Sequence, residues 1–208
     1  MGHAVILRSI DWVYNQSMGR RSLREERRAQ LLAAFARVLA REGFVGATII
    51  AVANEANVAP GLVHHYFTDK NELLTGLVAQ LMERFRRRTR VFEAETDALD
   101  AYILAALALD GTADVAAARC WVGVFAEAVR EPALFDQVRR LLDTEIQAIC
   151  RRSKGALTDQ DSGAVLAFIV GSLVFGAFAP RKTAGFAAPS LRRFVQALSR
   201  SRTRQLGH

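Results

Sequence analysis

Two adjacent histidines, a tyrosine and a lysine are the residues of this chain whose types and spacing best suit polar recognition. His64, His65, Tyr66 and Lys70 lie within one short stretch. Imidazole, phenol and ammonium groups donate hydrogen bonds to acceptors on base edges or to phosphate oxygens. A metal site is disfavoured, because neighbours on a helix point about 100° apart and no Cys or carboxylate stands at ligand spacing. The alternative for the histidines is a pair of solvated surface residues.

Patterns that carry catalysis are missing from the sequence. It has no Gly-rich phosphate loop, no His-Glu-x-x-His and no Gly-x-Ser-x-Gly. Its two cysteines, Cys120 and Cys150, stand in apolar helical surroundings, where Cys is most often a small core residue. We therefore expect a protein that is not an enzyme and that uses no cofactor and no metal.

The composition predicts a mostly helical protein with a real core. The chain has 208 residues, which suits one domain of ordinary size or two small ones that share a core. Hydrophobic residues make up 51% and charged residues 24%, which excludes a disordered chain. Two cysteines cannot form a disulfide framework and fit a reducing cytoplasm, so we expect a cytoplasmic protein.

The net charge of +7 is unevenly placed along the chain. Residues 1–90 hold 14 basic and 8 acidic side chains, whereas residues 91–208 hold 14 and 13. A basic half beside a nearly neutral half suggests one part that binds a polyanion and another part with a different task. A generally Arg-rich protein is the plain alternative.

The N-terminus does not match a secretory signal. The apolar run at residues 4–7 is too short, and Asp11 interrupts the apolar residues after it. We expect residues 1–23 to be an N-terminal extension or a basic arm. Met18 precedes Gly19-Arg20-Arg21 and is an alternative start, which leaves residues 1–17 as an over-long reading of the gene.

One apolar segment is long enough to raise the question of a membrane. Residues 162–180 contain no charged side chain, and a helix of that length just reaches across a hydrocarbon core. A helix buried all round at a subunit interface is the favoured interpretation, because the rest of the chain has the pattern of amphipathic helices. We expect no membrane association.

The first part of the chain predicts two longer helices with two short helices between them. An amphipathic helix over residues 24–42 ends at Gly43, and Thr48 is a helix N-cap that opens a short helix to residue 56. After a turn at 57–59, Pro60 suits the first position of another short helix. Two short helices joined by a three-residue turn are typical of a helix-turn-helix. The next helix, residues 69–88, connects this unit to the rest.

The second part predicts further helices and no strand. Their positions are indicated by Gly, Pro and Asp punctuation, and they lie near residues 97–109, 113–130, 132–153, 159–179 and 189–203. The expected fold class is therefore all-α.

Residues 48–74 resemble the DNA-binding signature of the TetR/AcrR family of bacterial repressors. The matching positions are Thr48, Val58, Gly61, Tyr66, Phe67, Lys70 and Leu73. The similarity extends over residues 24–90. Two positions depart from the family pattern: Asn57 stands for a turn glycine, and Ala59 stands for a serine that could cap the helix or touch a phosphate. Residues 61–70 are most similar to the branch that contains repressors of choline-to-betaine genes.

The resemblance implies a two-part regulator. Residues 24–70 would form a three-helix DNA-binding domain, and residues 71–208 a helical ligand-binding and dimerisation domain. A recognition helix enters the major groove with its N-terminal residues at base edges; the candidates are Pro60, Gly61, Leu62, His64 and His65. By resemblance, phosphates would be bound by Thr48, Tyr66 and Lys70.

Residues for a ligand and for a second copy are also expected in the second part. The aromatic candidates for a ligand cavity are Tyr102, Trp121, Phe125 and Phe168, with simple core packing as the alternative for each. An intersubunit four-helix bundle would use the apolar helix and the last helix. Its candidate residues are Val165, Phe168, Ile169, Leu173, Phe194 and Leu198.

The function implied by these features is that of a ligand-responsive transcriptional repressor. It would bind a pseudo-palindromic operator as a homodimer, and an unknown small-molecule effector would release it. The alternative is a helical small-molecule-binding protein without sequence-specific DNA binding, of which Ala59 would be a symptom.

Overall fold

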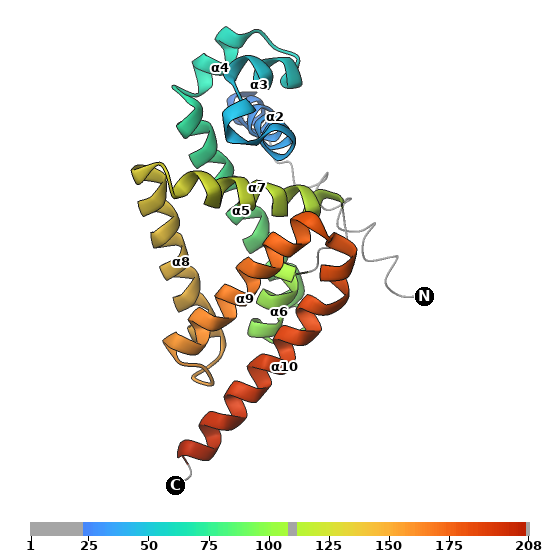
Figure 1. Cartoon of the computed structure of the whole chain (residues 1–208), viewed down its shortest axis with the longest axis vertical. Coiled ribbons are helices and arrows are strands. Elements are labelled where there is room, and N and C mark those ends of the chain that lie inside the picture. The colour runs from blue at the N-terminus through green and yellow to red at the C-terminus, as the bar shows by residue number, and fades with distance from the viewer. Residues whose placement is uncertain (1–22, 108–111, 207–208) are drawn as a thin grey trace.

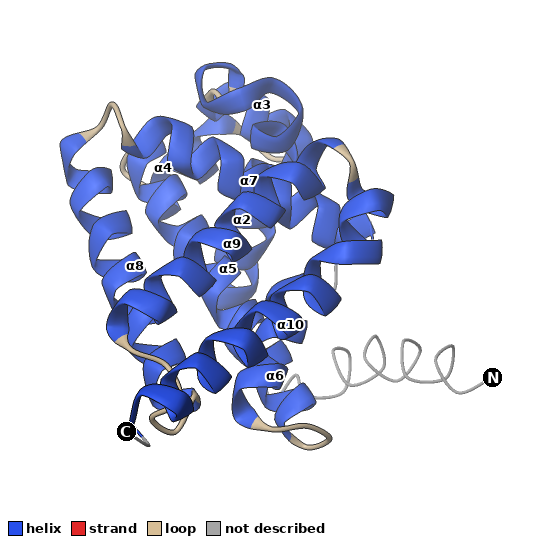
Figure 2. Cartoon of the chain, turned by 60° about the horizontal axis from the view of Figure 1, so that its bottom comes forward, coloured by secondary structure: helices blue, strands red, loops and turns tan. Residues whose placement is uncertain are grey.

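Helices joined by short turns make up the described part of the chain. The computed structural model describes residues 23–107 and 112–206, and within these it has nine helices and no strand (Figures 1 and 2). The all-α expectation is confirmed. Residues 1–22 of the predicted extension or arm lie outside the described residues. The helices are α2 (Leu23–Gly46), α3 (Ile49–Ala56), α4 (Pro60–Tyr66), α5 (Lys70–Glu93), α6 (Ala98–Leu107), α7 (Thr112–Ala128), α8 (Pro132–Arg152), α9 (Asp159–Phe178) and α10 (Pro180–Leu206).

The molecule is elongated, with α2, α3 and α4 gathered at one end (Figure 1). The long helix α5 leads from this end toward the other helices. Helix α7 packs against α2 on one side and against α9 on the other. Helices α6, α8, α9 and α10 form the rest of the molecule, so α5 and α7 are the two links between its ends.

Two clusters of buried apolar side chains hold these helices together. The first unites α2 to α5, with Phe35 and Leu74 at most 1% exposed, and it continues into α7 and into the start of α8 through Leu134. The second unites α6, α8, α9 and α10 around side chains such as Ile149 and Leu191. Full burial of one such side chain contributes about 1.5–3 kcal/mol. The core therefore does not divide at residue 71, and the domain boundary there stays a prediction.

Local signals place the helices of the first end. Gly43 adopts φ 71° and ψ 178°, a conformation that suits glycine alone, and it ends the regular part of α2. The Thr48 hydroxyl accepts a hydrogen bond from the Ala51 N–H at 3.1 Å, which confirms it as the N-cap of α3. Asn57 is left-handed with φ 54°, as expected for the turn, and Pro60 opens α4.

The last helix begins earlier than expected. The prediction of a helix over 189–203 is wrong at its start, because α10 begins at Pro180 and holds Pro189 inside it. An interior proline costs the helix the hydrogen bond to the carbonyl four residues back, here that of Gly185. Leu191 is fully buried in the second core. Packing of this helix against α9 and α6 thus outweighs the local preference that marks proline as a start.

Helix α9 is the one described helix with the length and hydropathy to cross a membrane. In this fold it lies between α7, α8 and α10. Its inward side chains, such as Val165 and Ile169, belong to the second core, and the hydroxyl-bearing Ser162 and Ser172 are buried with them. Only 39% of its most apolar window is buried, so α9 is a core helix with an apolar outer face.

Candidate nucleic-acid interface

Helix α4 carries the expected base-reading residues on its outer side. Pro60, Gly61, His64 and His65 are exposed, and Leu62 is half-buried. Helix α4 stands at the far end of the molecule with α2 and α3 (Figure 1). The structure thus brings these five residues together on one short helix that is open to solvent.

The inner side of α4 fixes the helix to the core. Val63 is fully buried and Phe67, directly after the helix, is 1% exposed. Ala59 occupies the N-cap position without a side-chain hydrogen bond, as its residue type requires. A Cβ atom added at Gly61 would meet nothing within 4 Å. The fold itself therefore does not require glycine at this position.

Tyr66 combines packing with a surface position. The ring is half-buried against the first core. It lies edge-on to the His65 ring, with 5.1 Å between the ring centroids. Phe67, by contrast, is part of the first core.

Arg28 ties α2 to the end of α4, and sequence reasoning missed it. Its guanidinium donates to the Tyr66 carbonyl at 2.9 Å, lies 4.2 Å from the centroid of the Phe67 ring, and stands 3.4 Å from the Glu72 carboxylate. These partners are 38 and 44 residues away in the chain, so no local pattern could reveal them. Arg28 therefore orients α4 relative to α2 and α5.

The start of α5 is capped by two acids. The Asp69 carboxylate accepts from the Glu72 N–H at 2.8 Å. The Glu72 carboxylate accepts from the hydroxyl of Thr68 at 2.6 Å and from its N–H at 2.8 Å. These two hydrogen bonds, followed by the Arg28 guanidinium, lower the pKa of the Glu72 carboxyl. The α4–α5 turn is thus held by charged groups.

Lys70, an expected phosphate contact, has a partner within the protein. Its ammonium group donates to the Phe44 carbonyl at 2.7 Å and lies 4.1 Å from the centroid of the Phe44 ring. An ammonium group has three donors, so two remain for another acceptor. The hydroxyl of Thr48 accepts at the N-cap of α3 and keeps its own proton to donate. The phosphate roles of Thr48 and Lys70 stay predictions.

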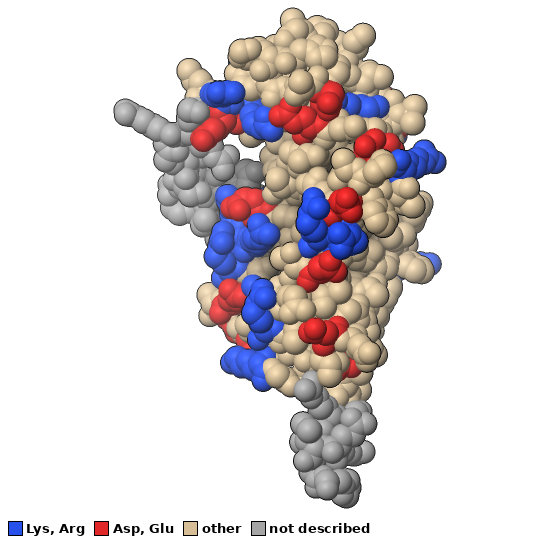
Figure 3. All heavy atoms as spheres, turned by 90° about the vertical axis from the view of Figure 1, so that its left-hand side faces the viewer, with Lys and Arg blue, Asp and Glu red and all other residues tan. Residues whose placement is uncertain are grey.

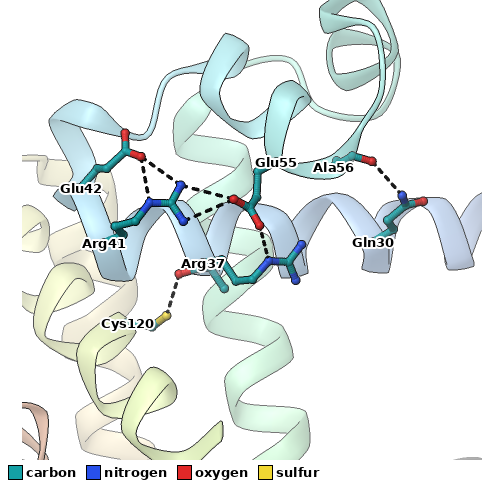
Figure 4. A network of polar contacts seen from close by, with 8 residues as sticks. Gln30, Arg37, Arg41, Glu42, Glu55, Ala56 and Cys120 are labelled. Carbon is teal, nitrogen blue, oxygen red and sulfur yellow. Dashed lines mark hydrogen bonds and ion pairs between the residues drawn. The ribbon is translucent and has the colours of Figure 1, made fainter. Parts of the chain in front are cut away.

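A surface network joins α3 to α2 (Figure 4). The Glu55 carboxylate accepts from Arg37 at 2.6 Å and from Arg41 at 3.3 Å, and Arg41 also pairs with Glu42. The Arg37 hydrogen bond, followed by that of Arg41, lowers the pKa of the Glu55 carboxyl. Exposed pairs of this kind contribute little to stability, because solvent screens them. Much of the positive charge of α2 is therefore paired.

Helix α7 meets α2 at close range. The Cys120 thiol contacts the Ala36 carbonyl at 3.4 Å (Figure 4). A Cβ atom at Gly123 would lie 3.3 Å from the Leu39 side chain, so glycine permits the approach. Burial raises the pKa of the Cys120 thiol to about 11. Cys120 is a core thiol, as expected.

The four expected ligand-binding aromatics divide between the two core clusters. Trp121 and Phe125 stack on each other, with 5.7 Å between centroids, and pack against the first core. Tyr102 and Phe168 belong to the second core. Two cavities of about 370 and 350 Å³ open elsewhere. The first is lined by Asn71, Leu74, Thr75, Glu131, Ala133, Leu134, Gln137 and Arg140, the second by Glu25, Arg28, Ala29, Leu32 and Gln80.

Tyr102 instead takes part in a buried polar cluster that sequence reasoning missed. Its hydroxyl donates to the Glu145 carboxylate at 2.8 Å, and both residues are buried. The Arg152 guanidinium lies 5.5 Å from the centroid of its ring and pairs with Glu93 at 3.4 Å. Burial, followed by the charge of Glu145, raises the pKa of the Tyr102 hydroxyl. The cluster links the end of α5 to α6 and α8.

The expected dimer residues divide between the inner and outer faces of α9 and α10. Val165 and Ile169 are buried in the second core, so their place in an intersubunit interface is corrected. An almost wholly apolar helix gives no sequence signal for which side faces its own core. Phe168, Leu173 and Leu198 are half-buried, and Phe194 is exposed. The other large apolar side chains exposed on these helices are Val174, Phe175, Phe178 and Phe186.

Comparison with known proteins connects this geometry to a family. Residues 31–77, which run from α2 into α5, match the family model described as bacterial regulatory proteins, tetR family. The transcriptional regulator BetI of Burkholderia mallei is 32% identical over 121 residues, which is 56% of this chain and 62% of the relative. The chain thus carries a segment that matches the TetR family. BetI of Paraburkholderia phymatum is similar at 32% identity over 116 residues, 54% of this chain and 59% of that protein.

The match to these curated relatives spans less than two thirds of their length. Solved structures share the fold over more of the chain. A transcriptional regulator from Rhodococcus has a TM-score of 0.74 at 23% identity, over 84% of this chain and 96% of that one. Salmonella enterica GusR has a TM-score of 0.69 at 20% identity, over 88% and 100%. EbrR, a multidrug binding protein solved with malachite green, has a TM-score of 0.62 at 21% identity, over 81% and 98%.

Proposed function

We propose that this chain is a ligand-responsive transcriptional repressor that binds operator DNA as a homodimer. The observation that carries the proposal is α4, whose exposed Gly61, His64 and His65 stand at the end of a firmly tied three-helix unit. A major groove about 12 Å wide admits such a helix. We assign DNA binding to residues 24–70 and the other tasks to residues 71–208.

Groups around α4 are suited to hold the DNA backbone. Thr48 caps α3, Tyr66 is the last residue of the recognition helix, and Lys70 begins α5. In our proposal these three bind phosphates and set the register, while α4 reads the bases. The hydrogen bond from Lys70 to the Phe44 carbonyl fixes the position of the ammonium group before DNA binds.

The exposed faces of α9 and α10 support a dimer. Phe175 on α9 is 64% exposed and Phe194 on α10 is 39% exposed, and large apolar surfaces of this kind mark interfaces. Two copies related by a two-fold axis would bury these faces in a four-helix bundle. The operator would then carry two inverted half-sites about 34 Å apart or a multiple of that distance.

A small-molecule effector would release the repressor. EbrR, a neighbour in fold, was solved with malachite green and with imidazole, and we infer a small-molecule ligand for this chain as well. Its binding would shift α5, which runs from Lys70 to Glu93, and change the spacing of the two recognition helices. A coupling of about 1–3 kcal/mol suffices. We place the protein in the cytoplasm, where its DNA target lies, with no membrane partner.

Selection of binding sites tests the proposal. The purified chain is mixed with random duplex DNA at physiological salt, and bound sequences are recovered and amplified. We expect an inverted repeat with half-sites about one helical turn, or a multiple of it, apart. Recovery of no motif by a folded, dimeric protein would contradict the proposal.

The second candidate is a small-molecule-binding protein without sequence-specific DNA binding. One observation favours it: α4 has no Lys or Arg, and Lys70 already holds the Phe44 carbonyl. This candidate predicts ligand binding together with failure of the site selection. A repressor predicts that both experiments succeed.

A further inference from the structure

A cavity of about 370 Å³ opens between the first turns of α5 and the first turns of α8. Asn71, Leu74 and Thr75 of α5 form one wall, and α8 supplies the other wall with residues such as Leu134 and Gln137. The size falls within the range of small-molecule sites, about 300–1,000 Å³. The aromatic residues expected for an effector lie elsewhere, so this cavity is a separate feature.

The cavity has an apolar floor and polar walls. Leu74 and Leu134 are 1% and 5% exposed and belong to the first core. The Thr75 hydroxyl donates to the Gln137 side-chain carbonyl at 3.3 Å across the cavity. That bond leaves the NH₂ group of Gln137 to donate to another molecule. An apolar body with polar ends fits such walls.

Two opposite charges on α8 frame this floor. Glu131 occupies the N-cap position without a side-chain hydrogen bond, and Arg140 stands nine positions later, about 13 Å along the helix axis. Within the described residues, neither side chain has a hydrogen-bond or ion-pair partner. Neighbouring Arg139, by contrast, pairs with Asp136 and Asp143. The cavity therefore presents one unpaired anion and one unpaired cation.

The surroundings do not favour a ligand with net charge. Seen from the side on which α8 lies, acidic and basic side chains alternate over the surface (Figure 3). A simple anion would be attracted by Arg140 and repelled by Glu131. A simple cation would be attracted by Glu131 and repelled by Arg140. A molecule that carries both charges satisfies both groups.

We propose that this cavity is a binding site for a small zwitterion with an apolar middle. Its carboxylate would pair with the Arg140 guanidinium, its ammonium group with the Glu131 carboxylate, and its methylene chain would lie on Leu74 and Leu134. The backbones of the two residues stand about 13 Å apart along the helix axis, so a chain of several methylenes reaches from one charged group to the other when both side chains project away from the axis. The proposal concerns binding to the free protein and does not depend on whether the chain binds DNA.

Calorimetric titration of the full chain with three matched probes tests this site. The probe 6-aminohexanoate carries both charges, whereas hexanoate and hexylammonium carry one each. We expect 6-aminohexanoate to bind at least about tenfold more tightly than either single-charge probe, because a hydrogen bond to a charged group contributes at least that factor. Equal affinities for the three probes, or no binding of 6-aminohexanoate, would overturn the proposal.

Variants on α8 locate the site. Arg140→Gln and Glu131→Gln should each remove the advantage of 6-aminohexanoate over one single-charge probe. The matched control Arg139→Gln, one residue away and outside the cavity, should leave the affinity unchanged. Ala133 is exposed at the cavity wall, so Ala133→Phe should block binding while the thermal unfolding midpoint stays within a few degrees. Binding that survives Ala133→Phe, or that falls equally in Arg139→Gln, places the ligand elsewhere.

The titration separates this inference from the proposed function. It contains no DNA, so its failure leaves the operator-binding proposal untouched. Conversely, if the site selection fails but 6-aminohexanoate binds, the proposed zwitterion site is supported and the repressor proposal is contradicted.

Discussion

At the scale of single residues, long-range polar contacts set the position of α4. Arg28 donates to the last carbonyl of α4, and Glu72 binds Thr68 in the turn between α4 and α5. The exposed side chains of α4 take no part in these polar contacts. Substitutions on its outer face should therefore change DNA binding without unfolding the protein, whereas changes at Arg28 should affect both.

Gly61→Ala separates fold from recognition most cleanly. The added methyl group meets nothing within 4 Å, and alanine is favoured over glycine in helices by up to about 1 kcal/mol. We expect unchanged or slightly higher stability in urea and operator binding at least about tenfold weaker, because a backbone close to DNA has no room for the methyl. Full operator affinity in this variant would show that the α4 backbone does not approach the bases.

Lys70→Ala tests a side chain that binds the Phe44 carbonyl and, in our proposal, also a DNA phosphate. Loss of a phosphate contact should weaken operator binding and reduce the slope of log affinity against log salt by about one ion. Loss of the hydrogen bond to Phe44 should also lower the free energy of unfolding by about 1 kcal/mol. A salt slope equal to that of the wild type would remove Lys70 from the phosphate contacts and leave it a structural residue.

Glu72→Gln tests the charged turn before α5. The pKa of this carboxyl is lowered in the folded protein, so its contribution is present above the unfolded pKa and disappears as the pH falls through the folded one. The variant should be less stable at pH 7, by under about 1 kcal/mol because solvent screens the pair. Its stability should also decline less than that of the wild type between neutral pH and pH 3. Parallel pH profiles would contradict this role.

At the scale of elements, the ends of the helices show what a sequence can and cannot reveal. Thr48, Asn57 and Pro60 act on their immediate neighbours, so the helix-turn-helix was predictable from local chemistry and from its resemblance to a family. The start of α10 was not, because packing around Leu191 carries the helix through Pro189. The tie from Arg28 to α4 was equally hidden, since it joins residues far apart in the chain.

The packing of α7 on α2 predicts a protected thiol. Cys120 is 2% exposed, and its pKa is raised to about 11, so at pH 8 little of it is thiolate. In a Cys150→Ser background, which leaves Cys120 as the only cysteine of the chain, a thiol reagent should label the folded protein at least about 100-fold more slowly than the urea-unfolded protein. Rapid labelling would mean that α7 separates from α2 in solution.

At the scale of the whole molecule, the inner and outer faces of α9 should behave differently. Phe175→Ser removes an exposed side chain, so it should weaken the dimer in sedimentation experiments with little change in stability at high protein concentration. Val165→Ala leaves a cavity in the second core and should cost about 2 kcal/mol of unfolding free energy, with the dimer retained. A monomeric wild type, or a dimer untouched by Phe175→Ser, would contradict the assignment of this face.

At this scale, the function was harder to predict from the sequence than the fold was. Helical periodicity predicts that Val165 and Phe175 lie on an apolar helix, but only the packed structure shows that the first faces the core and the second faces out. The same holds for Trp121 and Tyr102, which belong to different core clusters. The exposed positions of α4 were easier to predict, because they fall within one seven-residue helix, and their role in reading DNA stays a prediction.

The most direct test of a dimeric operator-binding protein is its affinity and stoichiometry on the selected sequence. Fluorescence anisotropy at physiological salt would compare the recovered inverted repeat with a scrambled duplex of the same length. We predict two protomers per repeat and an affinity at least about 10³-fold above that for the scrambled duplex. Equal, salt-sensitive binding to both duplexes would contradict sequence reading by α4.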